Sequence, residues 1–325
     1  MTNPDLPAHP CYLNGAYTPL NEAKVSVMDR GFIFGDGIYE VLPVYRSASG
    51  LNFFRFEHHM ARLERSLAEL RIPNPLARDA WRSIANELIV ARATSADSAG
   101  VSSVHPSDYL IYLQVTRGVA LRDHVMPQNI TPTVFAMCTV MNPPSPEVRA
   151  KGVACVSAND FRWQKAHIKS TSLLGSVMAR QIGADVGATE TVMFRGEQLS
   201  EASSSNVWVV KNGTVYGPPK DNLVLEGIRF SLIEEICKAQ GIGYLLRPIN
   251  REEVLTCDEL ILSSATKEVL PVTLLDGKPV GHASHAGAPG PVYQKLYTGY
   301  QAAKAASALA SVPIAAGTPV LSTPA

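Results

Sequence analysis

The stretch MNPPSPEVRA, residues 141–150, divides the chain into two parts. It carries three prolines within four positions: Pro143, Pro144 and Pro146. Proline lacks a backbone N–H and fixes its own φ angle, so this density opposes a continuous helix or a central strand. We therefore predict a linker over 141–149, between an N-terminal domain at 1–140 and a C-terminal domain at 150–300.

The part before the linker mixes a helix with strands. The segment EHHMARLERSLAELRI (57–72) has apolar residues at helical spacing: Met60, Leu63, Leu67 and Leu70. DYLIYLQVTRG (108–118) and PTVFAMCTVM (132–141) are rich in β-branched and aromatic residues, as buried strands are. Between the helix and the first of these strands, the small and polar stretch 92–108 predicts a loop. The N-terminal domain is therefore expected to be a mixed α/β domain.

The part after the linker also mixes both element types. SNVWVVKNGTVYGP (205–218) is two β runs joined by Asn212-Gly213, a strong hairpin signal. GIRFSLIEEICKAQG (227–241) has one apolar helical stripe and ends on a glycine. After residue 301 the chain is rich in alanine and then in proline, threonine and serine, which predicts a flexible tail over 301–325. Strands and helices do not alternate regularly, and GxGxxG and GxxxxGK[ST] motifs are absent, so a mixed α+β fold is favoured over Rossmann and P-loop folds.

Composition favours a small-molecule function. Lysine plus arginine and aspartate plus glutamate number 29 each, so no charge excess suggests a nucleic acid or a membrane surface as partner. Five dispersed cysteines without a CxxC pair argue against disulfides and structural zinc, and we expect reduced, mostly buried thiols and no metal site. The polar start MTNPDLPAHP differs from a secretory signal, and no apolar run reaches the length of a membrane span. A cytoplasmic protein is expected.

Lys169, in WQKAHIKSTSLLG (163–175), has two interpretations. Most lysines lie in solvent with their stems along the surface, and spacing alone favours that reading. A lysine whose amine is buried away from water is instead a nucleophile that can form a Schiff base.

Three other positions also have two interpretations each. The glycines of GFIFGDGIYEV (31–41) form either a strained turn or a backbone that approaches a ligand, with the Tyr39 phenol presented to it. Arg62 is either a solvated helix-edge residue or a phosphate ligand. Arg122 and His124 leave an extended segment on the same side, as a carboxylate trap or as charges of a surface loop.

Two further stretches concern anion and cation binding. Glu201 precedes three serines and Asn206, which form a solvated turn or hold an ionised carboxylate that pairs with a buried cationic nitrogen. LEGIRF (225–230) and LSSATKEV (262–269) place small or hydroxyl-bearing residues where a helix or turn begins. Their backbone N–H groups, with Ser264 and Thr266, cap the element or bind a phosphate.

Taken in order, these stretches resemble a known enzyme family. DRGFIFGDGIYEV, HHMARL, RWQKAHIKS, SEASSSNV and SSATKEVLPV are similar to motifs of the class IV pyridoxal-phosphate aminotransferases, which have fold type IV. The likeness spans roughly residues 12 to 300, and YLQVTRG…RDH resembles the D-amino acid aminotransferases. It implies a smaller N-terminal α/β domain, a larger C-terminal domain with a β-barrel-like core, and a homodimer with a shared active site.

The resemblance also implies roles for the residues above. Lys169 would form the Schiff base with pyridoxal phosphate and move the substrate's proton, while Glu201 would pair with the pyridinium nitrogen. Leu225 would pack on the cofactor ring. The phosphate would be bound in and around two turns: by Arg62, by the backbone amides of Ile228 and Arg229, and by the turn of Ser264, Ala265 and Thr266. The substrate carboxylate would be fixed by Tyr39 and, from the neighbouring subunit, by Arg122 and His124.

Three positions depart from the family pattern. Arg229 stands where the family usually has a phosphate-binding hydroxyl, and Ala265 stands where related enzymes often have a second one. Leu121 precedes Arg122 where proline is common, so the loop that carries the trap is less rigid. A cofactor affinity below the family norm is expected.

The expected activity is transamination of D-amino acids, with D-alanine and 2-oxoglutarate giving pyruvate and D-glutamate. The alternatives are an L-branched-chain aminotransferase, against which the Arg122 and His124 pair argues, and an aminodeoxychorismate lyase. A cofactor carrier without activity is opposed by the presence of both Lys169 and Glu201.

Overall fold

The computed structural model describes residues 5–47, 50–98, 108–281 and 286–310. The chain forms two compact units. The first comprises Met1–Met141, Lys169–Ser172 and Ala306–Ala325, and the second comprises Asn142–Ile168 and Leu173–Ala305. The main division falls at the start of the proline-rich stretch.

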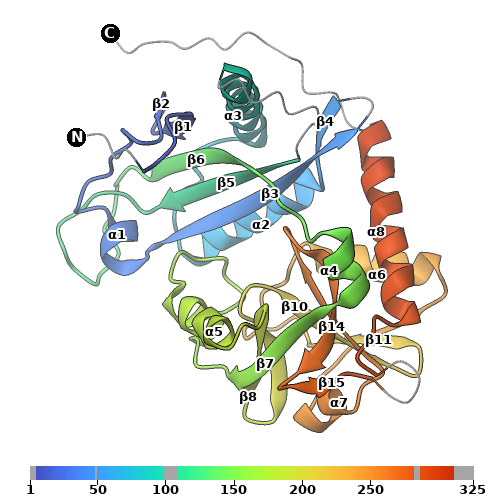
Figure 1. The fold of residues 1–325 in the computed structure, drawn as a ribbon. Coiled ribbons are helices and arrows are strands. Elements are labelled where there is room, and N and C mark those ends of the chain that lie inside the picture. The colour runs from blue at the N-terminus through green and yellow to red at the C-terminus, as the bar shows by residue number, and fades with distance from the viewer. Residues whose placement is uncertain (1–4, 48–49, 99–107, 282–285, 311–325) are drawn as a thin grey trace. The chain divides into compact units, whose positions relative to one another are not determined.

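The first unit is built on an antiparallel sheet with the strand order β2-β1-β6-β5-β3-β4 (Figure 1). Its strands are β1 (Pro10–Leu13), β2 (Ala16–Pro19), β3 (Gly37–Ser47), β4 (Gly50–Phe53), β5 (Tyr109–Thr116) and β6 (Thr133–Val140). Its helices are α1 (Arg30–Phe34), α2 (Phe56–Glu69) and α3 (Arg78–Ser98). The two strands and the helix predicted from hydrophobic pattern are confirmed as β5, β6 and α2.

Helix α3 extends into a stretch that was predicted to be a loop. It continues through residues 92–98 of that stretch. Those residues are small and polar but include neither glycine nor proline, so nothing in them ends a helix. The remainder of that predicted loop, 99–107, lies outside the described residues.

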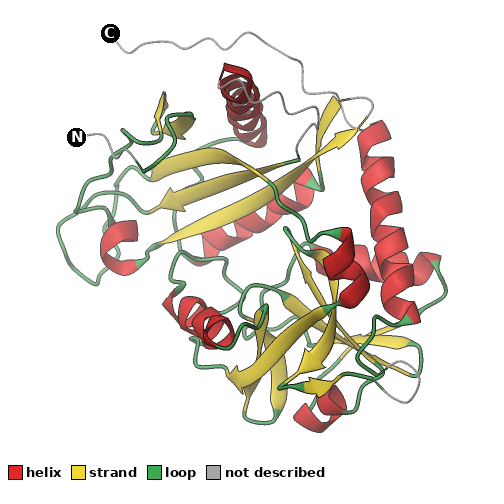
Figure 2. Ribbon diagram, in the orientation of Figure 1, coloured by secondary structure: helices red, strands yellow, loops and turns green. Residues whose placement is uncertain are grey.

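The second unit holds a sheet with the order β12-β11-β10-β13-β14-β7-β8-β9, and β15 pairs with β14. Figure 2 shows the strands in yellow and the helices in red. Its strands are β7 (Val153–Asn159), β8 (Glu190–Arg195), β9 (Gln198–Ala202), β10 (Asn206–Lys211), β11 (Thr214–Gly217), β12 (Gly243–Leu246), β13 (Glu259–Ser264), β14 (Glu268–Leu275) and β15 (Lys278–Pro279). The sheet curls around one apolar core to which strands from both halves contribute, including Val192, Val207, Leu262 and Val272. This curled sheet matches the barrel-like core expected of the C-terminal domain.

The remaining helices are α4 (Pro146–Lys151), α5 (Leu174–Asp185), α6 (Arg229–Ala239), α7 (Arg251–Leu255) and α8 (Pro291–Ala310). The predicted helix in 227–241 is confirmed as α6, and Gly241 follows its last turn with φ +65°. The predicted hairpin is also confirmed, since Asn212 (φ +50°) and Gly213 (φ +72°) join β10 to β11 in a left-handed turn.

The predicted linker and the predicted flexible tail each contain part of a helix. Helix α4 begins inside the proline-rich stretch, because Pro146 occupies its first turn and the Ser145 hydroxyl caps it by accepting from the Val148 N–H. Proline is well tolerated there, where its missing N–H has no helical partner to lose. Helix α8 runs to Ala310, so residues 301–310 are not a tail; their alanines are strong helix formers. Residues 311–325 lie outside the described part of the chain.

All five cysteines are buried and free, as expected. Burial raises the pKa of the Cys138, Cys155, Cys237 and Cys257 thiols to about 12, which keeps them protonated at neutral pH.

A buried ion pair ties α2 to the sheet of the first unit. Glu40 of β3 is fully buried and accepts from Arg62 Nε and Nη2 at 2.6 and 2.8 Å. His59 Nδ1 lies 2.8 Å from the same carboxylate. Burial alone would raise the pKa of Glu40, but Arg62 and His59 hold it well below the ordinary value.

We predict that Glu40→Gln lowers the free energy of unfolding at pH 7 by about 3–5 kcal/mol, because it removes the buried carboxylate that compensates the buried Arg62 charge. Because the folded-state pKa of Glu40 is depressed, its stabilisation is complete above the ordinary pKa of 4.5 and is lost as pH falls below that value. Urea unfolding over a pH series should therefore show a shallower acid decline in the variant.

The control is Glu57→Gln on the same helix, since Glu57 forms an exposed pair with Arg78. Its loss should stay within about 1 kcal/mol. Equal stability of the two variants at pH 7 would contradict the assignment.

Candidate active site

Lys169 lies along strand β3 of the first unit. Its carbonyl accepts from the Tyr39 N–H at 3.0 Å, and the Thr171 N–H donates to the Gly37 carbonyl at 2.9 Å. The Lys169 side chain is half-buried, and its Nζ lies 4.0 Å from the centre of the Tyr39 ring. This backbone pairing assigns residues 169–172 to the first unit, whereas the sequence analysis placed Lys169 within the C-terminal domain.

Tyr39 belongs to a row of aromatic side chains on the same sheet. Its ring stacks on Tyr112 of β5 at 5.7 Å. Burial raises the pKa of Tyr112 to about 12, and its hydroxyl donates to Gln114 Oε1 at 2.8 Å. The ring of the half-buried Tyr39 therefore contacts both the Lys169 amine and the neutral ring of Tyr112.

Arg122 and His124 lie on an irregular loop between β5 and β6 and are exposed. The alternation of an extended strand does not place them together, because no strand forms there. Instead, both side chains lie against one ring: Arg122 Cζ is 5.5 Å and the His124 ring 5.4 Å from the centre of the Phe34 ring. The structure thus brings the two predicted trap residues to one place on α1.

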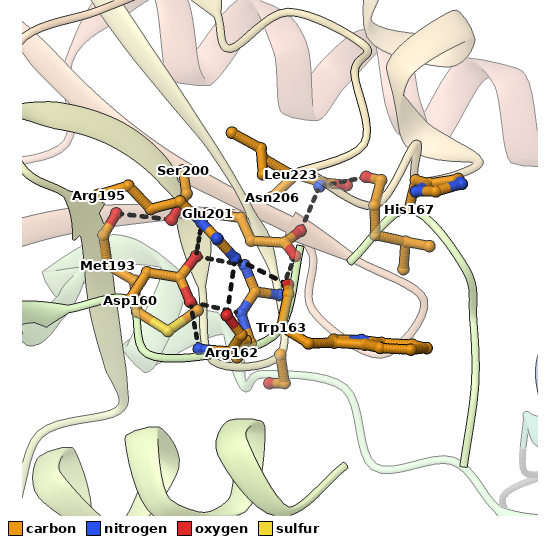
Figure 3. A network of polar contacts seen from close by, with 12 residues as sticks. Asp160, Arg162, Trp163, His167, Met193, Arg195, Ser200, Glu201, Asn206 and Leu223 are labelled. Carbon is orange, nitrogen blue, oxygen red and sulfur yellow. Dashed lines mark hydrogen bonds and ion pairs between the residues drawn. The ribbon is translucent and has the colours of Figure 1, made fainter. Parts of the chain in front are cut away.

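Glu201 lies at the end of β9 in a buried polar network (Figure 3). Arg162 Nη1 donates to its Oε1, and Asn206 Nδ2 donates to its Oε2 at 3.2 Å. Arg162 is held in turn by Asp160, through Nε at 3.0 Å and Nη2 at 2.8 Å. Burial raises the pKa of the Glu201 carboxyl, and the Arg162 charge acts in the opposite direction.

Arg162 and Asp160 were not predicted from the sequence to belong to this network. Arg162 stands in the RWQKAHIKS motif, seven positions before Lys169, and a charged residue in that motif was the one indication of a functional role. Nothing in the sequence showed that its partner would be Glu201, 39 residues away.

The serine run after Glu201 serves a different carboxylate. Ser203, Ser204 and Ser205 donate their hydroxyls to Glu190 of β8, which is fully buried. Of the donors expected for Glu201, only Asn206 reaches it. Lys267 Nζ completes the Glu190 site at 2.8 Å. Burial alone would raise the pKa of Glu190, but the Lys267 charge and the hydrogen bonds from Lys267 and the serine hydroxyls together hold it below the ordinary value.

The turn between β13 and β14 carries the predicted phosphate ligands. Ser264 Oγ and Thr266 Oγ1 lie 3.4 Å apart, and Ser264 Oγ accepts from the Lys267 N–H at 3.1 Å. Ser264, Ala265 and Thr266 are all half-buried. Lys267 directly follows Thr266 in the chain. Its ion pair with Glu190 therefore holds the turn that carries the two hydroxyl groups.

Leu225 and the start of α6 join the same unit through Asn206. Asn206 Nδ2 donates to the Leu225 carbonyl at 2.9 Å as well as to Glu201. Gly227 packs so closely on Asn206 that a Cβ at position 227 would overlap the amide oxygen. Ile228, the residue before the helix, is buried and has no side-chain cap.

The guanidinium groups of Arg229 and Arg62 both have protein partners. Arg229 is buried and donates from Nε and Nη2 to the Tyr300 hydroxyl at 3.2 and 2.9 Å. Arg62 is paired with Glu40, as described above. A role of either side chain toward a phosphate stays a prediction.

Within the described ranges, no group of three or more His, Cys, Asp or Glu side chains is arranged to hold a metal ion. The helices of this part of the chain also lack the length and apolar character needed to cross a membrane.

Known proteins resemble the chain along most of its length. It is 34% identical over 288 residues to D-alanine aminotransferase of Bacillus licheniformis, which covers 89% of this chain and 94% of the relative. It is also 34% identical over 291 residues to D-alanine aminotransferase of Staphylococcus aureus strain MSSA476, which covers 89% and 96%.

Solved structures share the fold at lower identity. Branched-chain amino acid aminotransferase of T.th., with pyridoxamine 5'-phosphate, superposes with a TM-score of 0.80 at 23% identity and covers 91% of this chain and 94% of that one. The fold IV transaminase CpuTA1 of Curtobacterium pusillum does so with 0.69 at 20% identity, covering 86% and 90%. The predicted two-domain α+β fold of type IV is confirmed.

The family description "Amino-transferase class IV" matches residues 37–275, from the first residue of β3 to the last residue of β14. The matched segment contains Lys169, Glu201 and the turn at 264–266. The chain belongs to the class IV aminotransferases.

Proposed function

We propose that the chain transaminates D-amino acids with pyridoxal phosphate, using D-alanine and 2-oxoglutarate as the substrate pair and giving pyruvate and D-glutamate. The observation that carries the D-amino acid proposal is the pair of Arg122 and His124 on the Phe34 ring. An arginine fork beside an imidazole suits a substrate carboxylate. The relatives named D-alanine aminotransferase, at 34% identity over 89% of the chain, support the same substrate.

The residues of each unit fit the cofactor. In the first unit, the Lys169 amine lies on the Tyr39 ring rather than free in solvent. In the second unit, Glu201 is a buried carboxylate whose raised pKa would be lowered by a further N–H donor with positive charge. The hydroxyls of Ser264 and Thr266 are half-buried and close together, as a phosphate requires.

When bound, pyridoxal phosphate supplies an electron sink that makes the α-proton of an amino acid labile. Lys169 would anchor it covalently, and its Nζ would accept and return the α-proton. Glu201 would accept a hydrogen bond from the ring nitrogen, and Arg162 would keep that carboxylate ionised and oriented. Leu225, held through its carbonyl by Asn206, would contact the ring face.

The phosphate would be bound mainly by the second unit. Its ligands would be the hydroxyls of Ser264 and Thr266, the backbone of Ala265, and the amides of Ile228 and Arg229 at the start of α6, where the helix dipole favours an anion. Arg62 is a further candidate whose guanidinium also binds Glu40.

Tyr39, Arg122 and His124 would hold the substrate carboxylate. The last two would reach the active site of a neighbouring subunit, so the proposed enzyme is a homodimer. The competing proposal, an L-branched-chain aminotransferase, draws on solved structures of that name that share the fold. An aminodeoxychorismate lyase would release pyruvate without any amino acceptor.

Substrate handedness is tested by mixing the purified, cofactor-loaded protein with D-alanine and, separately, with L-leucine. We expect D-alanine alone to bleach the cofactor's visible absorbance band, because the proposed trap serves the D-enantiomer. Bleaching by L-leucine alone would assign the chain to the branched-chain enzymes, and no bleaching by either would favour the lyase.

Replacement of the lysine tests the covalent role. Lys169→Ala should remain folded and lose at least about a thousandfold in transamination rate, since the group that moves the proton is removed. The matched control is Lys165→Ala, an exposed lysine of the same segment, which should keep its rate. Substantial turnover by the Lys169 variant, measured as pyruvate formed from D-alanine, would refute the role.

The phosphate turn can be tested through its anchor. Lys267→Met should weaken pyridoxal phosphate binding about tenfold, because a charge-assisted bond that fixes the turn is worth about 1.5–3 kcal/mol. The Kd is measured by fluorescence titration of the cofactor-free protein. Lys211→Met removes an exposed ion pair with Asp258, away from the turn, and serves as the control for loss of a lysine charge. Equal Kd values for both variants would exclude the anchor role.

A further inference from the structure

The loop that carries Arg122 and His124 is attached at its base to residues 28–30. The Arg30 N–H donates to the Gly118 carbonyl at 2.9 Å, and the Ala120 N–H donates to the Met28 carbonyl at 3.3 Å. Beyond this base the loop has little apolar support, because Leu121 is 87% exposed and Val125 is 71% exposed. Side chains of α1 contact the loop where Arg122 and His124 lie.

Arg30 makes the direct connection. Its side chain is buried, and its Nη1 donates to the Asp123 carbonyl at 2.6 Å. That carbonyl belongs to the residue between Arg122 and His124. Arg30 Nε is itself fixed by Asp36 Oδ2 at 2.8 Å.

Asp36 is a rigid support for this contact. Arg117 also binds it, from Nε at 2.7 Å and Nη2 at 2.9 Å, and donates further to the carbonyls of Leu70 and Arg71. Burial alone would raise the pKa of Asp36, but Arg117 and Arg30 hold it below the ordinary value. The carboxylate stays charged at neutral pH and keeps its ion pairs with both arginines.

Phe34 provides the surface on which both side chains of the pair lie. Arg30 Cζ lies 4.7 Å from the ring centre, in addition to the contacts of Arg122 and His124. A cation above an aromatic face is attracted by the ring, and the flat ring restricts the rotamers of the groups on it. One ring therefore sets the spacing of the two groups.

We propose that Arg30 and Phe34 are positioning residues that orient Arg122 and His124 and thereby set the affinity for the substrate carboxylate. A proline directly before Arg122 would fix its own φ angle and stiffen the loop. This chain has Leu121 there, so the proposal assigns the positioning of the loop to Arg30 and Phe34. The inference rests on the proposed function, in which the pair binds that carboxylate.

The experiment compares Phe34→Leu and Arg30→Lys with wild type, with Phe32→Leu as the matched control. Phe32 is on the same helix, and its side chain is 71% exposed. Four quantities are measured for each protein: the Kd for pyridoxal phosphate, kcat and KM for D-alanine, and the inhibition constant of propionate, which has a carboxylate but no amino group.

We expect KM and the propionate inhibition constant to rise together about five- to tenfold in both test variants. The Kd for pyridoxal phosphate should not change, and Phe32→Leu should behave as wild type. Phe34→Leu leaves the Arg30 and Asp36 pair intact, so it stays informative if Arg30→Lys does not fold.

Two outcomes would overturn the proposal: unchanged propionate inhibition in Phe34→Leu, or a parallel loss of cofactor affinity, which would indicate a general structural defect. The proposed function fails separately, if wild type does not react with D-alanine. The dissociation constant of propionate, measured by titration of the cofactor's absorbance band, then still decides whether α1 positions the pair, because this titration needs no turnover and propionate has no handedness.

Discussion

A carboxylate removed from water needs a cation beside it, and this constraint organises both units. Glu40 takes Arg62 in the first unit. In the second, Glu190 takes Lys267, Glu201 takes Arg162, and Glu268 takes Arg149 and Lys304. In each pair the partners come from different elements, so satisfying the charge also fixes where those elements lie. Glu201 differs, because burial raises its pKa despite the opposing Arg162 charge. A further cationic donor beside such a carboxylate would stabilise its ionised form.

Local pattern was sufficient for much of the fold. The apolar stripe of α2, the strands β5 and β6 and the Asn212-Gly213 hairpin follow from periodicity and turn chemistry, which act over a few residues. Two predictions differ from the structure. Proline opposes a helix interior but not a first turn, so the predicted linker does not anticipate α4. Alanine is a strong helix former, so α8 continues into the stretch that was predicted to be a flexible tail.

The sequence proposes the candidate site residues but not their contacts. Residue types and motif order pointed to Lys169, Glu201 and the turn at 264–266, but long-range pairing decides what each one touches. The serines that follow Glu201 serve Glu190, and Arg162 binds Glu201 from 39 residues away. Arg122 and His124 come together through an aromatic ring from a distant segment. Such partners are set by the folded topology, which a single sequence does not display.

The glycine at position 227 has a consequence for redesign of this enzyme. Its missing side chain lets Asn206 approach, and Asn206 holds both the Leu225 carbonyl and the Glu201 carboxylate. A mutant library that diversifies residues 225–230, which the proposed function assigns to the cofactor, should therefore keep glycine at position 227. Any side chain at 227 displaces the amide and disturbs two neighbours at once, so useful variation there should be confined to the flanking residues.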